Sequence, residues 1–174
     1  MMMAPAAEAT GLAASIAALA APWAKLFSHS KVVSAGTLFV HLAPLIAGGG
    51  VAFSADIATL RAFRSGATER SRLLAELAGT HRWVLFGLTL SFLSGILLFL
   101  SDVETFLGSV FLWIKLGFVA LLLINGFLLT RVEAALNRNP DDGAQWNRLR
   151  AIAMLSACLW IATTLAGVVL KEFA

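Results

Sequence analysis

A histidine, a lysine and two serines are the polar residues whose spacing within apolar segments could support chemistry. His41 lies in the stretch LFVHLAPLIAGGGVAFSADIATLR, residues 38–61, and Lys115 lies in a later apolar run. An imidazole can ligate haem iron or another metal ion, and an ammonium group can bind an anion or a carbonyl oxygen. Polar groups in such segments are costly, so each of them needs a partner or a function.

The composition indicates that these residues belong to a membrane protein. The 174 residues are 59% hydrophobic and 13% charged, whereas a soluble domain usually has about 25% charged residues. Four runs between charged residues come close to, or exceed, the roughly 20 residues that a helix needs to cross the hydrocarbon core of a bilayer. Backbone groups in lipid must be paired within their own segment, so each run is predicted to be a helix.

The sequence therefore predicts an all-α fold, an integral membrane four-helix transmembrane bundle that forms one domain over residues 32–174. The expected helices cover residues 32–60, 82–101, 105–131 and 149–171. Residues 1–31 are expected to form an interfacial segment that lies on or near the outer membrane surface. The reason is that residues 9–24 are apolar but Ala-rich and too short to span.

The positions of the basic residues predict the topology. All nine arginines fall within residues 61–82 and 131–150, and the net charge of +3 comes from these links rather than from a basic surface. The positive-inside rule then places both links in the cytoplasm and both termini outside. This distribution points to a lipid bilayer and not to nucleic acid as the partner. The only cysteine, Cys158, excludes an intrachain disulfide.

Helix geometry predicts that the candidate site residues share one level of the bundle. With a rise of 1.5 Å per residue, His41 and Lys115 lie about 14 and 15 Å from the outer ends of their helices. Ser91 and Ser94 fall at a similar height on the second helix, which runs the other way. His41, Lys115, Ser91 and Ser94 are therefore expected to converge as a cofactor site, with His41 as the candidate metal ligand.

A second polar layer is expected further along the first helix. Asp56 lies about 22 Å beyond His41 along the helix axis. It is predicted to form an interfacial ion pair with Arg61, with a proton relay as the alternative. His81, at the start of the second helix, lies in the same layer. Small residues on the other helices, Gly87, Gly95, Gly117, Gly126 and Gly167 among them, are expected to allow close helix packing.

A haem held by two histidines is not expected. The antiparallel second helix places residue 91 opposite His41, so that His81 is displaced by about 15 Å along the axis. Haem b would then need a five-coordinate site, a different ligand or a second subunit; otherwise His41 is a hydrogen-bonded packing residue. Lys115 either extends its side chain towards the membrane surface or binds an anionic headgroup, a quinone or a carboxylate.

The whole pattern resembles a family of uncharacterised bacterial four-helix integral membrane proteins, distantly similar to copper-resistance-D-like and cytochrome-b-like membrane bundles. The stretches that carry the resemblance are VHLAPLIAGGGVAFSADIATLR, HRWVLFGLTLSFLSGILLF, FLWIKLGFVALLLINGF and LSACLWIATTLAG. It implies that His41, Asp56, Lys115 and Asn125 occupy characteristic polar positions. It also implies a multi-pass protein of the bacterial cytoplasmic membrane. The family's aspartate is followed directly by leucine and arginine, and this chain departs from that pattern at ADIATLR.

Three functions follow as expectations. The leading one is a non-catalytic membrane subunit that packs against other membrane subunits of a larger, electron-transfer (respiratory or photosynthetic) assembly. The chain has almost no residues outside the predicted spans and no CxxC, CxxCH, HExxH or GxxxxGK motif. The alternative is a small redox protein that binds haem b or a quinone at His41 and Lys115. The third is a small carrier or channel whose polar path runs from His41 to Asp56.

Overall fold

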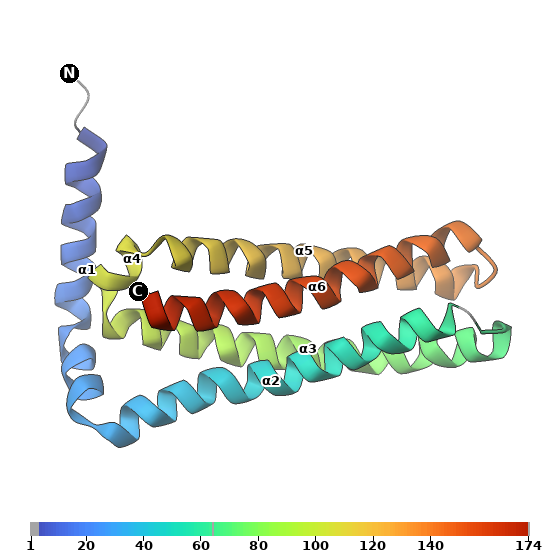
Figure 1. Ribbon diagram of the computed structural model, residues 1–174, viewed down its shortest axis with the longest axis horizontal. Helices are drawn as coiled ribbons and strands as arrows, with labels where there is room; N and C mark the ends of the chain where they lie inside the picture. The colour runs from blue at the N-terminus through green and yellow to red at the C-terminus, as the bar shows by residue number, and fades with distance from the viewer. Residues whose placement is uncertain (1–3, 64, 174) are drawn as a thin grey trace.

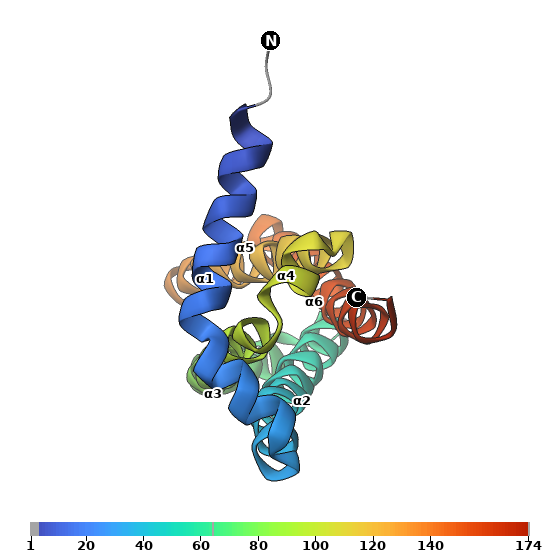
Figure 2. The ribbon, with the colours of Figure 1, turned by 90° about the vertical axis from the view of Figure 1, so that its left-hand side faces the viewer.

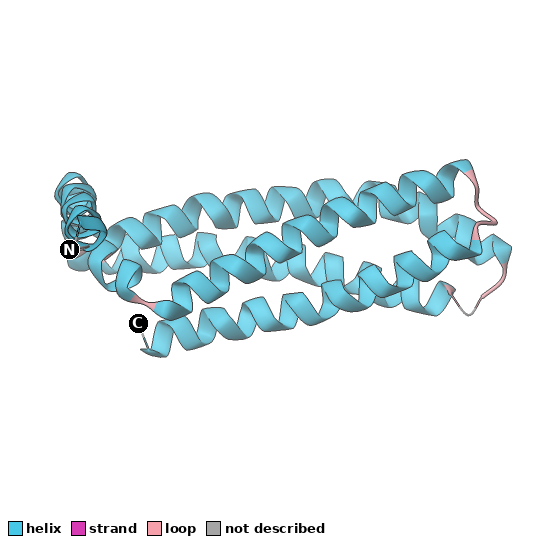
Figure 3. Cartoon of the chain, turned by 90° about the horizontal axis from the view of Figure 1, so that it is seen from above, coloured by secondary structure: helices cyan, strands magenta, loops and turns pink. Residues whose placement is uncertain are grey.

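The computed structural model describes residues 4–63 and 65–173, which form helices joined by short connections (Figures 1 and 3). The predicted all-α fold is confirmed. The helices are α1 (Ala4–His29), α2 (Lys31–Ala62), α3 (Ala67–Ser101), α4 (Val103–Gly108), α5 (Val110–Arg138) and α6 (Gly143–Phe173). Of these, α2, α3, α5 and α6 are each long and apolar enough to cross a membrane. The chain is therefore a multi-pass membrane protein, and its orientation across the bilayer stays a prediction.

The four long helices lie side by side in a bundle, and α1 runs across one end of it (Figure 1). The connections that follow α2 and α5 lie at the opposite end, here called the turn end. The short α4 contacts α1, and the C-terminal end of α6 lies at the same end of the bundle, called the α1 end. Long antiparallel helices with short connections pair naturally in this way.

The helices extend beyond the charge-free runs from which they were predicted. The second spanning helix begins at Ala67 rather than at residue 82, and its added turns expose Arg72 and Glu76, which pair at 3.0 Å. The charge-free run marks the part that tolerates lipid, whereas the helix continues wherever its polar side chains reach water. The first and last spanning helices likewise extend, to residues 31–62 and 143–173.

The start predicted for the helix over residues 105–131 is wrong. Its first residues belong to α4, and α5 begins only at Val110. The chain breaks its helical path at Asp102, whose backbone has φ −157° and ψ 73°. The Asp102 side chain then accepts a hydrogen bond from the backbone N–H of Thr105 at 3.3 Å and so caps α4. Aspartate is a favoured residue at this position because it pairs a free helix N–H.

The N-terminal segment forms a helix that packs across the α1 end (Figure 2). Ser30 separates α1 from α2 in an extended conformation, and its hydroxyl caps α2 by accepting from the backbone N–H of Val33 at 3.3 Å. The indole N–H of Trp23 donates to the backbone carbonyl of Leu97 on α3 at 2.8 Å. The axis of α1 runs across the axes of the four long helices, and its place at the membrane surface stays a prediction.

Replacing Trp23 by phenylalanine is expected to loosen α1 from the bundle. The variant removes the hydrogen bond to Leu97 and keeps an aromatic ring, so the cost is about 1 kcal/mol. Amide hydrogen exchange in α1 should accelerate several-fold while exchange in α5 stays the same. The matched control is Trp83→Phe, because Trp83 is exposed and far from α1 in the chain. Equal exchange in α1 for wild type and Trp23→Phe would show that this contact does not hold the helix.

A buried apolar cluster joins the two helical hairpins at the turn end. Trp146, Leu136 and Leu149 are fully buried within it. The indole N–H of Trp146 donates to the carbonyl of Pro140 at 2.8 Å, and the guanidinium of Arg70 lies 5.1 Å from the centre of the Trp146 ring. Aromatic faces attract such cations, which lets an arginine pack against the core. The α2–α3 hairpin is thereby packed against the α5–α6 hairpin at this end.

Candidate functional site

Two polar layers lie along the bundle. The one nearer the α1 end, called the outer polar layer, joins α2 to α3 through His41, Ser91 and Ser94. His41 Nδ1 lies 2.8 Å from the carbonyl oxygen of Ser91 and 3.3 Å from Ser94 Oγ. In return, the Ser91 hydroxyl donates to the carbonyl of His41 at 3.0 Å. The prediction that residue 91 lies opposite His41 is confirmed. Because a carbonyl oxygen only accepts, Nδ1 carries the hydrogen in this contact, and Nε2 keeps its lone pair when the ring is neutral.

Lys115 enters the same layer from α5. Its charge acts on the His41 ring, and its Nζ atom lies 3.6 Å from where a Cβ on Gly167 of α6 would be. Among the described residues, the Lys115 ammonium has neither an ion-pair partner nor a hydrogen-bond acceptor. The structure thus brings His41, Ser91 and Ser94 into contact, and Lys115 lies near them on α5.

His81 lies in the polar layer nearer the turn end, called the inner polar layer. It is paired with Glu133, a residue that was not predicted from the sequence. His81 Nε2 of α3 lies 2.6 Å from Glu133 Oε2 of α5, and Glu133 is buried. Glu133 occurs in an arginine-rich segment where a carboxylate is usually solvated. The sequence did contain a signal that Glu133 is buried. Its spacing from Asn125, Leu129 and Leu136 is helical, which places it on one buried face of α5.

Asp56 also lies inside the bundle, away from Arg61. Only 3% of its surface is exposed, and the Ser156 hydroxyl of α6 is within hydrogen-bonding reach of its carboxyl group. The predicted Asp56–Arg61 ion pair does not occur among the ion pairs of residues 4–63 and 65–173. The reason is helical geometry, because side chains five residues apart point in directions about 140° apart.

Asn125 is fixed next to this aspartate by a contact with the backbone of α6. Its Nδ2 donates to the carbonyl of Ile152 at 3.3 Å. Ile152 lies one turn before Ser156 on the same helix, so Asn125 and Asp56 approach α6 at neighbouring turns. The amide nitrogen is therefore occupied, and the amide oxygen points elsewhere.

A cavity of about 290 Å³, here called the inner cavity, lies between these residues. Asp56, His81, Asn125 and Ser156 line it, one from each of the four spanning helices. Asp56 Oδ2 and Asn125 Oδ1 are buried and have no hydrogen-bond partner, and neither has Glu133 Oε1 behind His81. Unpaired buried acceptors are rare in folded proteins because each costs about 1–3 kcal/mol.

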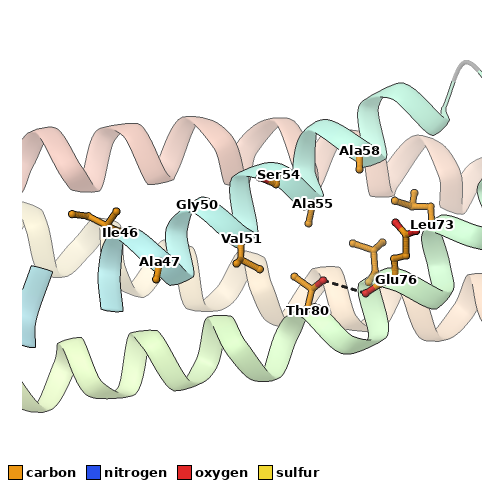
Figure 4. A pocket seen from close by; sticks show the side chains of 11 residues that line it. Ile46, Ala47, Gly50, Val51, Ser54, Ala55, Ala58, Leu73, Glu76 and Thr80 are labelled. Carbon is orange, nitrogen blue, oxygen red and sulfur yellow. Dashed lines mark hydrogen bonds between the residues drawn. The ribbon is translucent and has the colours of Figure 1, made fainter. Parts of the chain in front are cut away.

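A groove runs along α2 and α3 (Figure 4). Its α2 side is formed by small residues such as Gly50 and Ser54, and its α3 side ends at Glu76 and Thr80. The Thr80 hydroxyl donates to the backbone carbonyl of Glu76 at 3.1 Å. The groove and the inner cavity share three lining residues: Ala55, Leu77 and Thr80.

A further hollow of about 410 Å³ continues from the groove to the turn end. Its polar lining includes Arg61, Glu69 and Glu76, and it shares Glu76 and two apolar residues with the groove. The three hollows therefore follow one another from the turn end to the inner cavity. On the side of the inner cavity that faces the α1 end, the buried residues Leu122, Leu159 and Trp160 form an apolar layer with their neighbours.

The charges of the inner layer define what the site can bind. It contains two carboxyl groups, one imidazole and several hydrogen-bond acceptors, so it is complementary to a cation or to a hydrogen-bond donor. Within the described part of the chain, no group of three or more His, Cys, Asp or Glu side chains is arranged to hold a metal ion. The inner cavity therefore suits a ligand bound by hydrogen bonds and charge.

Glycines explain only part of the helix packing that the sequence predicted. A Cβ on Gly87 would lie 2.7 Å from the carbonyl oxygen of Pro44, and one on Gly95 would lie 3.2 Å from the His41 ring. Gly117 and Gly126 have no such neighbour within 4 Å. The expectation of close packing at those two positions is wrong: Gly117 is exposed, and Gly126 lines the inner cavity instead of touching a neighbouring helix.

Comparison of the chain with protein-family models, with curated proteins and with solved structures gives no match. The resemblance to a bacterial four-helix membrane family therefore stays a prediction, and the function has to be argued from the site.

Proposed function

We propose that the protein is a small membrane carrier that takes up a proton or another small cation in the inner cavity. The observation that supports this function is a cavity between all four spanning helices in which the buried acceptor atoms Asp56 Oδ2 and Asn125 Oδ1 lack a donor. Ionisable residues within a membrane-spanning bundle are expensive to keep and commonly mark a pathway for ions or protons.

The balance of charges favours a cation over an anion. Asp56 and Glu133 carry two carboxyl groups, and among the described residues the only base paired with either of them is His81, which pairs with Glu133. With the His81–Glu133 pair neutral overall, the charge of Asp56 has no partner. An uncompensated buried charge costs several kcal/mol. Uptake of a proton or a cation next to Asp56 removes that cost, and release of the ligand restores it.

The hollows favour a carrier over an open channel. The inner cavity shares Ala55, Leu77 and Thr80 with the groove, and the groove in turn shares Ala58, Leu73 and Glu76 with the hollow at the turn end. Towards the α1 end it meets the apolar layer around Leu122, Leu159 and Trp160. A site with hollows towards one end of the bundle and apolar packing towards the other corresponds to one state of alternating access. His41 and Lys115 lie beyond that layer and would line the path in the other state.

Replacing Asp56 by asparagine is expected to abolish cation uptake, because the amide keeps the size of the side chain and loses its charge. Purified wild-type protein and the variant are reconstituted into liposomes that contain a pH-sensitive dye, and proton flux is measured after a pH jump. We expect flux at least about tenfold lower in the variant, which corresponds to about 1.4 kcal/mol.

The matched control is Asp141→Asn, since Asp141 is exposed in the connection between α5 and α6. Its flux should equal that of wild type. Gel filtration and circular dichroism in detergent establish that Asp56→Asn is folded. A folded Asp56→Asn protein with wild-type flux would contradict the proposed function.

A second candidate is the accessory subunit of a larger assembly, in the bacterial cytoplasmic membrane and with an electron-transfer role. The observation in its favour is that α1 extends beyond the bundle (Figures 1 and 2) and that Leu19 on it is 84% exposed. An apolar side chain on an extended helix suits contact with another membrane protein. Purification from native membranes in mild detergent should then recover stoichiometric partners, whereas a pure monomer would contradict this role.

A further inference from the structure

We infer that the cation taken up in the inner cavity is a small protonated amine with an apolar body. This inference rests on the proposed function and names the chemical class of its substrate. Three features of the cavity lead to it: the geometry of the unpaired acceptors, the apolar character of the remaining wall, and the groove that reaches the cavity from the side.

The unpaired acceptors match the donors of an ammonium group. Asp56 and Asn125 are each 3% exposed, and their free oxygens Oδ2 and Oδ1 have no partner. The contact between Asn125 Nδ2 and the carbonyl of Ile152 holds the amide so that its oxygen remains available. A primary ammonium has three N–H donors and one positive charge. Asp56 can supply the opposite charge, and Asn125 and Ser156 can accept the remaining hydrogen bonds.

The rest of the cavity wall is apolar and suits the body of an amine better than a hydrated metal ion. Leu88, Leu122, Phe127 and Trp160 belong to this wall. A volume of about 290 Å³ is several times the roughly 30 Å³ that one water molecule occupies. It also lies close to the lower limit of about 300 Å³ for sites that bind small organic ligands. A bare inorganic ion would leave most of this apolar wall in contact with water.

Trp160 is held in a fixed position at this wall. Its ring packs against α2, where a Cβ on Gly49 would lie 3.0 Å from it. The indole is buried, and it lines the cavity together with Asp56 and Asn125. An aromatic face next to a carboxylate favours an organic cation, because the ring attracts the positive charge and also packs against the apolar body.

The groove offers such a ligand a route from the lipid. An amphipathic amine concentrates at the membrane interface, where its charge stays near water and its body enters the apolar region. The outer groove between α2 and α3 begins at Glu76 and reaches Ala55, Leu77 and Thr80, which also line the inner cavity (Figure 4). Glu69 lines the adjoining hollow at the turn end and adds a second acidic side chain.

Benzylamine and benzyl alcohol provide the test, because they have similar size and differ in charge at neutral pH. Binding of each to the purified full-length protein in detergent is measured by isothermal titration calorimetry, with sodium chloride as a probe for an inorganic cation. We expect saturable binding of benzylamine to wild type and to Asp141→Asn. Its affinity should fall at least tenfold in Asp56→Asn. Benzyl alcohol and sodium ions should not compete for the site.

The possible results separate this inference from the proposed function. Equal binding of benzylamine and benzyl alcohol, or benzylamine binding that does not depend on Asp56, overturns the inference. An absence of benzylamine binding together with proton flux that requires Asp56 also overturns it, while the carrier function stands. An absence of binding together with flux that is independent of Asp56 overturns both.

Discussion

Replacing Glu133 by alanine is expected to lower the free energy of unfolding by about 3 kcal/mol. The reason is that removal of one partner from a buried charged pair leaves the other without compensation. Glu133 Oε2 lies 2.6 Å from His81 Nε2, and only 8% of the glutamate side chain is exposed. The alanine variant leaves His81 facing an apolar gap between α3 and α5. Loss of the glutamate side chain also opens a cavity, which adds to the cost.

The measurement is unfolding of the purified protein in mixed micelles with increasing SDS, followed by circular dichroism. Two further variants serve as controls. The exposed pair Arg72–Glu76 has side chains that are 71% and 59% exposed, so Glu76→Ala should cost less than about 1 kcal/mol. The double variant His81→Leu with Glu133→Leu should be close to wild type, because a packed apolar pair replaces the polar one.

A loss for Glu133→Ala no larger than that for Glu76→Ala would contradict the assignment of a buried, energetically important pair. A double variant as unstable as Glu133→Ala would show instead that the length of the side chain, and not the pairing, stabilises this end of the bundle. The pair matters for the proposed carrier as well. It compensates one of the two carboxylates near the inner cavity and leaves the other, Asp56, to bind the ligand.

Replacing Gly87 by alanine is expected to destabilise the α2–α3 hairpin by about 1–3 kcal/mol, the usual cost of overpacking. A Cβ at this position would lie 2.7 Å from the carbonyl oxygen of Pro44 and 3.4 Å from the Cα of Gly48. Both neighbours are backbone atoms of α2, so no side-chain rotation can relieve the contact. The two helices would have to move apart along the segment that positions His41 and Asp56.

Gly126→Ala is the matched control for this variant, because a Cβ on Gly126 would have no neighbour within 4 Å. There the substitution only improves helix propensity, which favours stability by about 0.5–1 kcal/mol in a helix interior. SDS unfolding of both variants under the same conditions checks the pair of predictions. If Gly87→Ala is as stable as Gly126→Ala, then α2 and α3 do not approach as closely as described.

The predictions made from sequence for the outer polar layer depended on one quantity, the rise per residue of an α-helix. His41 and Ser91 face each other because both helices have the same rise per residue and a short connection joins them. Counting residues from that connection was therefore enough to place Ser91 opposite His41 and to separate His81 from it. The counting does not account for Lys115, because it started at residue 105 whereas α5 begins at Val110.

The inner layer required more than counting along helices. Asp56 was expected to face arginines because it lies near them in the sequence. The rotation of α2 turns it inward to Ser156, while Arg61 remains exposed. Glu133 was not predicted at all, because an acidic residue in an arginine-rich segment indicates a solvated surface unless its partner is known. That partner, His81, lies 52 residues away in the chain.

The sequence by itself determined that this chain crosses a membrane in four helices, because length and apolar composition decide whether a segment is stable in lipid. It also placed Ser91 opposite His41 and separated His81 from them, since these heights follow from the constant rise of a helix. Only the tertiary structure decided which polar residues meet across helices and which acceptors stay unpaired. Those contacts depend on how each helix is rotated and tilted against its neighbours, and close packing of many weakly specific side chains sets these angles.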